Sequence, residues 1–94
     1  MGRLSFREGP AFTKRFDALG GWHNDDLDKV MVAALEAMTM HPQKQPIVNK
    51  EFDIRVVETE QFRSIPAMEI FFYRPDKHTV EAIDMIEYPA DETT

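Results

Sequence analysis

Two arginines and one tyrosine are the side chains best suited to chemistry in this sequence. Arg55 lies in a stretch of alternating polar and apolar residues, so we expect it to project from the open face of a sheet. Arg63 precedes the next predicted strand, and Tyr88 ends the last one. Arginine holds phosphate through paired N–H donors, and a tyrosine hydroxyl can polarise a ribose 2′-hydroxyl. These three residues form our candidate catalytic set, with ion pairs to nearby glutamates as the structural alternative.

Other common catalytic and ligand-binding patterns are absent from the sequence. The chain has no cysteine and only four glycines, and it contains no glycine-rich phosphate loop. Its two serines, Ser5 and Ser64, lack the flanking residues of a nucleophile elbow. His23, His41 and His78 fall in loops or at element ends, where exposed or structural histidines are expected. We therefore predict neither a cofactor nor a metal.

Length and charge restrict the classes of function. The 94 residues are expected to form one domain, residues 1–94, with a frayed tail from about residue 89. The net charge of -6 argues against nucleic-acid binding. Residues 1–16, however, carry four basic side chains and one acidic side chain. No apolar run approaches the roughly 18 residues of a membrane span, and no secretory signal is evident. We expect a cytoplasmic protein without membrane association.

The first half of the chain predicts two helices. Residues 10–19 place Phe12, Phe16 and Leu19 on one helical face, and a Gly-Gly pair follows. A longer helix is expected after Asn24, a plausible N-cap, and Pro42 marks its end. Its core-facing stripe is spaced by threes and ones: Leu27, Val30, Met31, Ala34, Leu35 and Met38. The intervening Trp22 is expected to anchor the turn between the helices.

Alternation in the remaining segments predicts strands. They are expected at residues 3–7, 52–58, 68–73 and 79–88, and residues 74–78 form a turn between the last two. In the last strand, Val80, Ala82, Asp84 and Ile86 are expected on one face. The polar residues 43–50 are expected to be a loop. The fold class is therefore α+β, in the order β-α-α-β-β-β, with two helices packed on one face of a small antiparallel sheet.

The order of one strand, two helices and a run of strands, over nearly the whole chain, resembles the RelE/ParE toxin superfamily of toxin-antitoxin systems, as a divergent member. The resemblance rests on Arg-Ser-Ile-Pro at residues 63–66, the strand ending Phe-Tyr-Arg at residues 70–74, and Thr-Val-Glu-Ala-Ile-Asp-Met-Ile at residues 79–86. Tyr88 and Arg63 lie near a tyrosine and an arginine of that family. The chain departs from the family in its acidic balance and in the Glu-Tyr-Pro-Ala-Asp-Glu sequence after Ile86.

The resemblance implies a toxin that cleaves ribosome-bound mRNA or inhibits DNA gyrase, and an antitoxin protein as its partner. The alternative is a catalytically inactive protein-interaction module of the same fold. A third hypothesis is an unrelated small α+β domain, such as a ligand-binding or accessory protein. A free edge strand also leaves a homodimer open.

Overall fold

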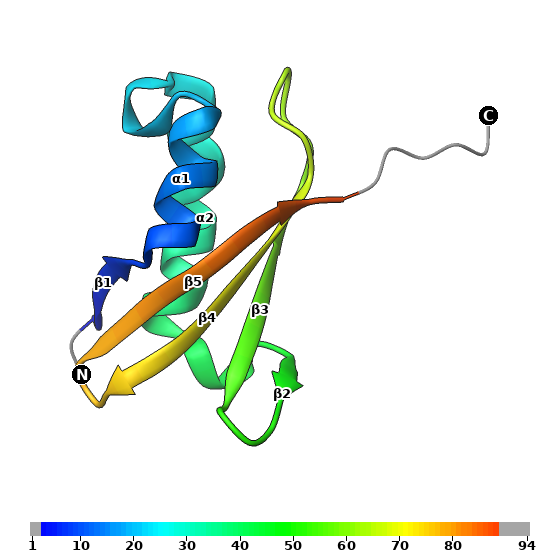
Figure 1. Cartoon of the computed structure of the whole chain (residues 1–94). Helices are drawn as coiled ribbons and strands as arrows, with labels where there is room; N and C mark the ends of the chain where they lie inside the picture. Colours follow the sequence, from blue (N-terminus) through cyan, green and yellow to red (C-terminus); the bar gives the residue numbers. More distant parts are fainter. Residues whose placement is uncertain (1–2, 89–94) are drawn as a thin grey trace.

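The protein is built from two layers, with two helices covering one face of a single sheet (Figure 1). A computed structural model describes residues 3–88. The sheet has five strands in the order β1-β5-β4-β3-β2. This arrangement confirms the predicted α+β class and the placement of the helices. It differs from the prediction in having one more strand and in pairing β1 parallel to β5.

Both helices begin and end where the local sequence favours it. Helix α1 (Pro10–Ala18) starts with a proline in its first turn, where the missing N–H has no intrahelical partner to lose. A short 3₁₀ turn, η1 (Gly21–His23), connects it to α2 (Asp25–Met40). Gly20 and Gly21 supply the positive φ angles of this connection, 108° and 60°. Helix α2 ends before η2 (Pro42–Lys44), as Pro42 predicted.

Four of the five strands were expected from the sequence, with shifted ends. They are β1 (Ser5–Glu8), β3 (Ile54–Thr59), β4 (Met68–Asp76) and β5 (Thr79–Glu87). Strand β4 therefore runs further than predicted, and its hairpin turn contains only Lys77 and His78. The Asp76 carboxylate stabilises this turn by accepting a hydrogen bond of 2.8 Å from the His78 backbone N–H.

The fifth strand, β2 (Ile47–Asn49), corrects the prediction of a loop over residues 43–50. It is short, it lies at the sheet edge, and it pairs only with the start of β3, through Arg55 and Ile54. The expected frayed tail from residue 89 lies outside the described residues. Among residues 3–88, no helix is long and apolar enough to cross a membrane.

A bulge in β5 changes which side chains face the helices. Phe71 pairs with Asp84 whereas Phe72 pairs with Ala82, so Ile83 is an extra residue in the ladder. The face that begins with Val80 and Ala82 therefore continues with Met85, which is 2% exposed. The prediction that Asp84 and Ile86 share the face of Val80 is wrong, because an inserted residue reverses the alternation.

The core lies between the helices and this face of the sheet. Its fully buried side chains include Phe12, Phe16, Leu27, Met31 and Met38 from the helices and Met68, Ile70, Phe72, Val80 and Ala82 from the strands. The Phe12 and Phe16 rings stack with their centres 5.2 Å apart, and the centre of the Trp22 ring lies 4.6 Å from that of Phe16. The Trp22 indole N–H donates to Glu8 at 3.0 Å. Trp22 thus joins the end of α1 to β1, and it lies at the turn between the helices as expected.

Candidate functional site

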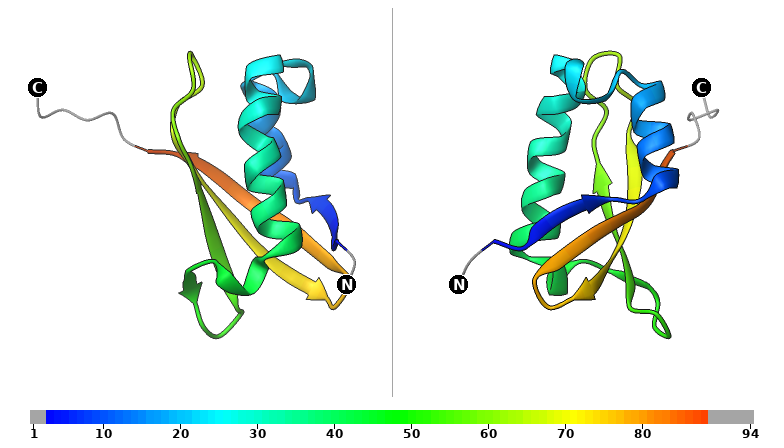
Figure 2. Two further views of the ribbon diagram at one scale, coloured as in Figure 1. Left: turned by 180° about the vertical axis from the view of Figure 1, so that it is seen from behind. Right: turned by 60° about the vertical axis from the view of Figure 1, so that its left-hand side comes forward.

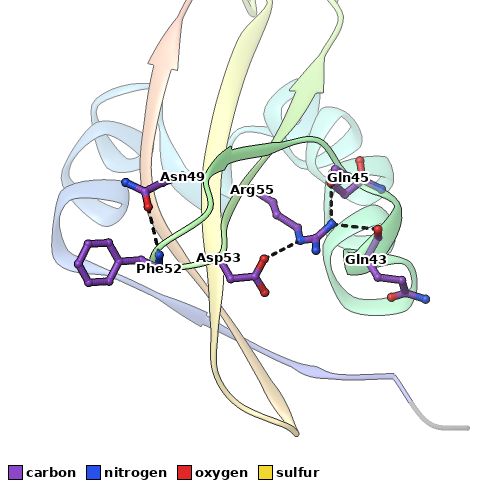
Figure 3. A network of polar contacts seen from close by, with 6 residues as sticks. All are labelled: Gln43, Gln45, Asn49, Phe52, Asp53 and Arg55. Carbon is purple, nitrogen blue, oxygen red and sulfur yellow. Dashed lines mark hydrogen bonds and ion pairs between the residues drawn. The ribbon is translucent and has the colours of Figure 1, made fainter.

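Arg55 is a structural connector on the helix side of the sheet. Its register partner in β4 is the core residue Phe72, which places Arg55 on the face covered by the helices. Its Nη1 donates to the carbonyl oxygens of Gln43 and Gln45, both at 2.9 Å, and its Nε contacts Asp53 at 3.2 Å (Figure 3). The expectation that Arg55 projects from the open face is therefore corrected.

Arg63 occupies the tip of the connection between β3 and β4. Phe62 and Ile65 exchange backbone hydrogen bonds of 2.9 Å, which closes a tight two-residue turn. Arg63 is the first residue of that turn and has a φ of 55°, a left-handed conformation that usually favours glycine. Its guanidinium lies 5.2 Å from the centre of the Phe62 ring and 3.3 Å from a carboxylate oxygen of Asp26. These contacts direct Arg63 toward the first turn of α2.

Tyr88 lies beside two carboxylates. Its hydroxyl is 3.5 Å from Oε2 of Glu69. Hydrogen bonding to Glu58, partial desolvation and the negative charges of Glu58 and Glu69 raise the pKa of Tyr88 to about 12. The hydroxyl therefore stays protonated at neutral pH, and the adjacent carboxylates repel a phosphate group.

The structure does not bring the three predicted catalytic residues together. Arg55 is bound by residues that follow the C-terminus of α2, whereas Arg63 contacts Asp26 in its first turn. With a rise of about 1.5 Å per residue, these two ends of the helix are separated by roughly 20 Å. Tyr88 comes two residues after Ile86, and Ile86 and its register partner Glu69 lie on the face away from the helices. A shared phosphate-binding site made from all three side chains is not present in this arrangement.

A groove of about 560 Å³ lies between α2 and β3. We refer to it as the α2–β3 groove. One wall is a flank of α2, where Lys29 and Val30 are followed by three alanines, Ala33, Ala34 and Ala37. The other wall is β3 and the connection that follows it. The lining residues are Lys29, Val30, Ala33, Ala34, Ala37, Gln45, Val57, Glu58, Thr59, Glu60, Gln61 and Phe62.

Strand β3 presents a free edge along this groove. The Val56 backbone N–H donates to the carbonyl of Pro46 at 3.1 Å, so the backbone groups of Val56 face the β2 side. Alternation gives the same direction to the backbone of Glu58. Before Pro46 the chain turns into η2, and the β2 register ends at Arg55, so β2 does not reach Glu58. The N–H and C=O groups of Glu58 are therefore unpaired by any described strand on that side.

The sequence contained only part of the signal for this groove. Ala33, Ala34 and Ala37 stand in the sequence as small helix residues that permit close packing. The free edge could not be seen, because it depends on where β2 stops. Among residues 3–88, no group of three or more histidine, cysteine or acidic residues could hold a metal ion.

Comparison with known proteins adds no family assignment. No protein-family model matches the chain, and no curated protein sequence is significantly similar to it.

Proposed function

We propose that this protein is an interaction module that works by binding an extended segment of a partner protein in the α2–β3 groove. The observation that carries this proposal is the free edge of β3 beside a groove of about 560 Å³. An exposed strand edge pairs readily with an added strand, because the incoming backbone satisfies the unpaired N–H and C=O groups.

The shape of the helix wall is consistent with an added strand. Ala33 and Ala37 project little from α2, which leaves room for side chains of the partner between the helix and β3. The half-buried side chains of Val30 and Phe62 supply apolar surface for side chains of an extended segment. Glu58 and Glu60 lie along the strand wall, and Lys29 lies on the helix wall. A partner segment with apolar residues on one side and basic residues near β3 matches these charges.

Binding fits the observed geometry better than RNA cleavage. The candidate residues Arg55, Arg63 and Tyr88 contact separate parts of the protein, and Tyr88 lies beside Glu69. The net charge of -6 opposes contact with a polyanion.

A second candidate is a RelE/ParE-like toxin that inhibits translation or DNA gyrase and is neutralised by an antitoxin. The coarse architecture, two helices on one face of a mostly antiparallel sheet, favours it. Under this proposal, the groove is a site at which an antitoxin segment can bind.

A peptide selection tests the binding function. The full chain is used to select binders from a displayed library of unstructured peptides, and their affinities are measured for two variants. Ala33→Arg places a long side chain in the groove and is expected to abolish binding. Val32→Arg is the matched control, because Val32 is the preceding helix residue, is 60% exposed and does not line the groove. Equal binding by both variants would show that the groove is not the site.

Controlled expression in bacteria tests the second candidate. Growth is followed together with radiolabel incorporation into protein and DNA. Rapid arrest of either synthesis would support the toxin, and arrest of protein synthesis abolished by both Arg63→Ala and Tyr88→Phe would support RNA cleavage. Normal growth with folded protein would leave the interaction module as the better account.

A further inference from the structure

A second surface lies on the opposite side of the sheet. The register places Val56, Phe71 and Ile86 on the face away from the helices, from three strands with β4 in the middle. No described helix covers this face, because α1 and α2 lie together on the other side of the sheet (Figure 1, Figure 2). Phe71 and Ile86 are half-buried, and Val56 is only 5% exposed. We refer to this apolar stripe and its neighbours as the open sheet face.

The charges beside this stripe are unbalanced. Glu58 lies directly opposite Glu69 in the antiparallel ladder. Like charges in this position destabilise a sheet. Among residues 3–88, neither carboxylate lies within 4.0 Å of a basic side chain, whereas Glu81 pairs with Arg7 and Asp84 pairs with Arg15. An incoming cation would remove the repulsion between Glu58 and Glu69.

We propose that the open sheet face is a docking surface for an amphipathic basic helix of a partner protein. Strand β4 is paired on both sides, with β3 and with β5, so the middle of the face offers side chains but no backbone hydrogen bonds. An extended segment lying there would bury its own unpaired backbone groups, whereas a helix satisfies them internally. Charge complementarity with Glu58 and Glu69 requires lysine or arginine next to the apolar stripe of that helix.

Other occupants match this face less well. The same face of a second copy carries the same glutamates and would be repelled. Residues 89–94 of this chain contain Asp91 and Glu92 and no basic residue. The phosphates of a nucleic acid are repelled by Glu58 and Glu69.

The open sheet face is distinct from the α2–β3 groove, and this proposal does not depend on the proposed function. Glu58 borders both surfaces, because it also lines the groove. Glu69 belongs to the central strand and does not line the groove. It is therefore the residue that tests the open sheet face alone.

The experiment uses the full chain and a synthetic helical peptide of about 18 residues, which makes about five helical turns. The peptide has leucine at a repeating i, i+3, i+4, i+7 spacing and lysine on both sides of that stripe. A second peptide has glutamate in place of each lysine. Calorimetry is expected to show binding of the lysine peptide only, with an affinity that falls as salt is raised. Equal affinity for the two peptides, or no binding of either peptide, would overturn the proposal.

Glu69→Gln separates docking from general stability. The variant is expected to bind the lysine peptide about fivefold more weakly, yet to melt about 1–5 °C higher, because it removes a like-charge contact. Glu36→Gln, an exposed position on α2, is the matched control and is expected to change neither quantity. Unchanged affinity in Glu69→Gln would overturn the proposal. Loss of lysine-peptide binding in the Ala33→Arg variant would also overturn the proposal, because that result would place the peptide in the α2–β3 groove.

Discussion

Asn24 is predicted to stabilise two helices with one side chain. Its Oδ1 accepts hydrogen bonds from the backbone N–H groups of Asp26 at 3.0 Å and Leu27 at 3.2 Å, which caps α2. Its Nδ2 donates to the carbonyl of Leu19 at 2.9 Å, just after the end of α1. Asn24→Ala removes all of these bonds, whereas Asn24→Ser keeps an oxygen for the cap and loses the bond to Leu19.

The expected cost follows from the two functions of the side chain. Loss of an N-cap costs about 1 kcal/mol. Loss of the hydrogen bond to the Leu19 carbonyl costs about 1 kcal/mol more, because the site is partly buried. Asn24→Ala is therefore expected to lower the free energy of unfolding by about 2 kcal/mol, and Asn24→Ser by about 1 kcal/mol. For a domain of this size, these losses correspond to melting temperatures lower by roughly 8–16 °C and 4–8 °C.

Urea unfolding followed by circular dichroism, with a thermal scan of each variant, measures these differences. The denaturant slope is expected to stay constant, so that the midpoint alone reports stability. Equal losses in the alanine and serine variants would refute the capping contribution. Stability unchanged in both would refute the whole interpretation of the turn between the helices.

Three further predictions concern other sites. In a Tyr73→Phe variant, Tyr88 is the one remaining tyrosine, and its absorbance titration is expected to have a midpoint near 12. The contribution of Tyr88 to stability is present below pH 10 and is lost as the pH rises toward 12. A midpoint at the ordinary value of 10.0 would contradict the placement of Tyr88 beside two carboxylates. Arg55→Lys is expected to cost about 1–2 kcal/mol in urea unfolding, because lysine lacks the planar fork that bonds two carbonyls and a carboxylate. Met31→Ala, at a fully buried position, is expected to cost about 2–4 kcal/mol, whereas Val32→Ala next to it is expected to change stability by less than about 0.5 kcal/mol; similar losses in the two would contradict the core assignment.

Elements with strong local signals could be predicted from the sequence. The N-cap at Asn24, the apolar stripe of α2 and the proline at its end are each encoded within a few residues. The β4–β5 hairpin was predicted for the same reason, although β4 extends further into the turn. Features that depend on pairing were missed. Strand β2 has three residues and exists through its contacts with β3, and the bulge at Ile83 is set by register with β4.

The face of Arg55 was misassigned because β3 has apolar residues on both of its faces. Ile54 and Val56 suggested one core-facing side, and Val57 suggested the other. In the structure, Val57 faces the helices and is 4% exposed, while Val56 is buried on the open sheet face and is 5% exposed. Local alternation cannot choose between two such sides, since the choice depends on which one α2 covers. The site prediction depended on that choice, and so did the expected convergence of Arg55 with Tyr88.

Hydrogen exchange of single backbone amides, measured by NMR with and without a peptide selected for binding, tests the central claim most directly. If the partner segment adds to the edge of β3, the amide of Glu58 will exchange much more slowly in the complex. The amide of Val57, which already faces β4, will change little. Unchanged exchange at Glu58 in a saturated complex would contradict strand addition in the α2–β3 groove.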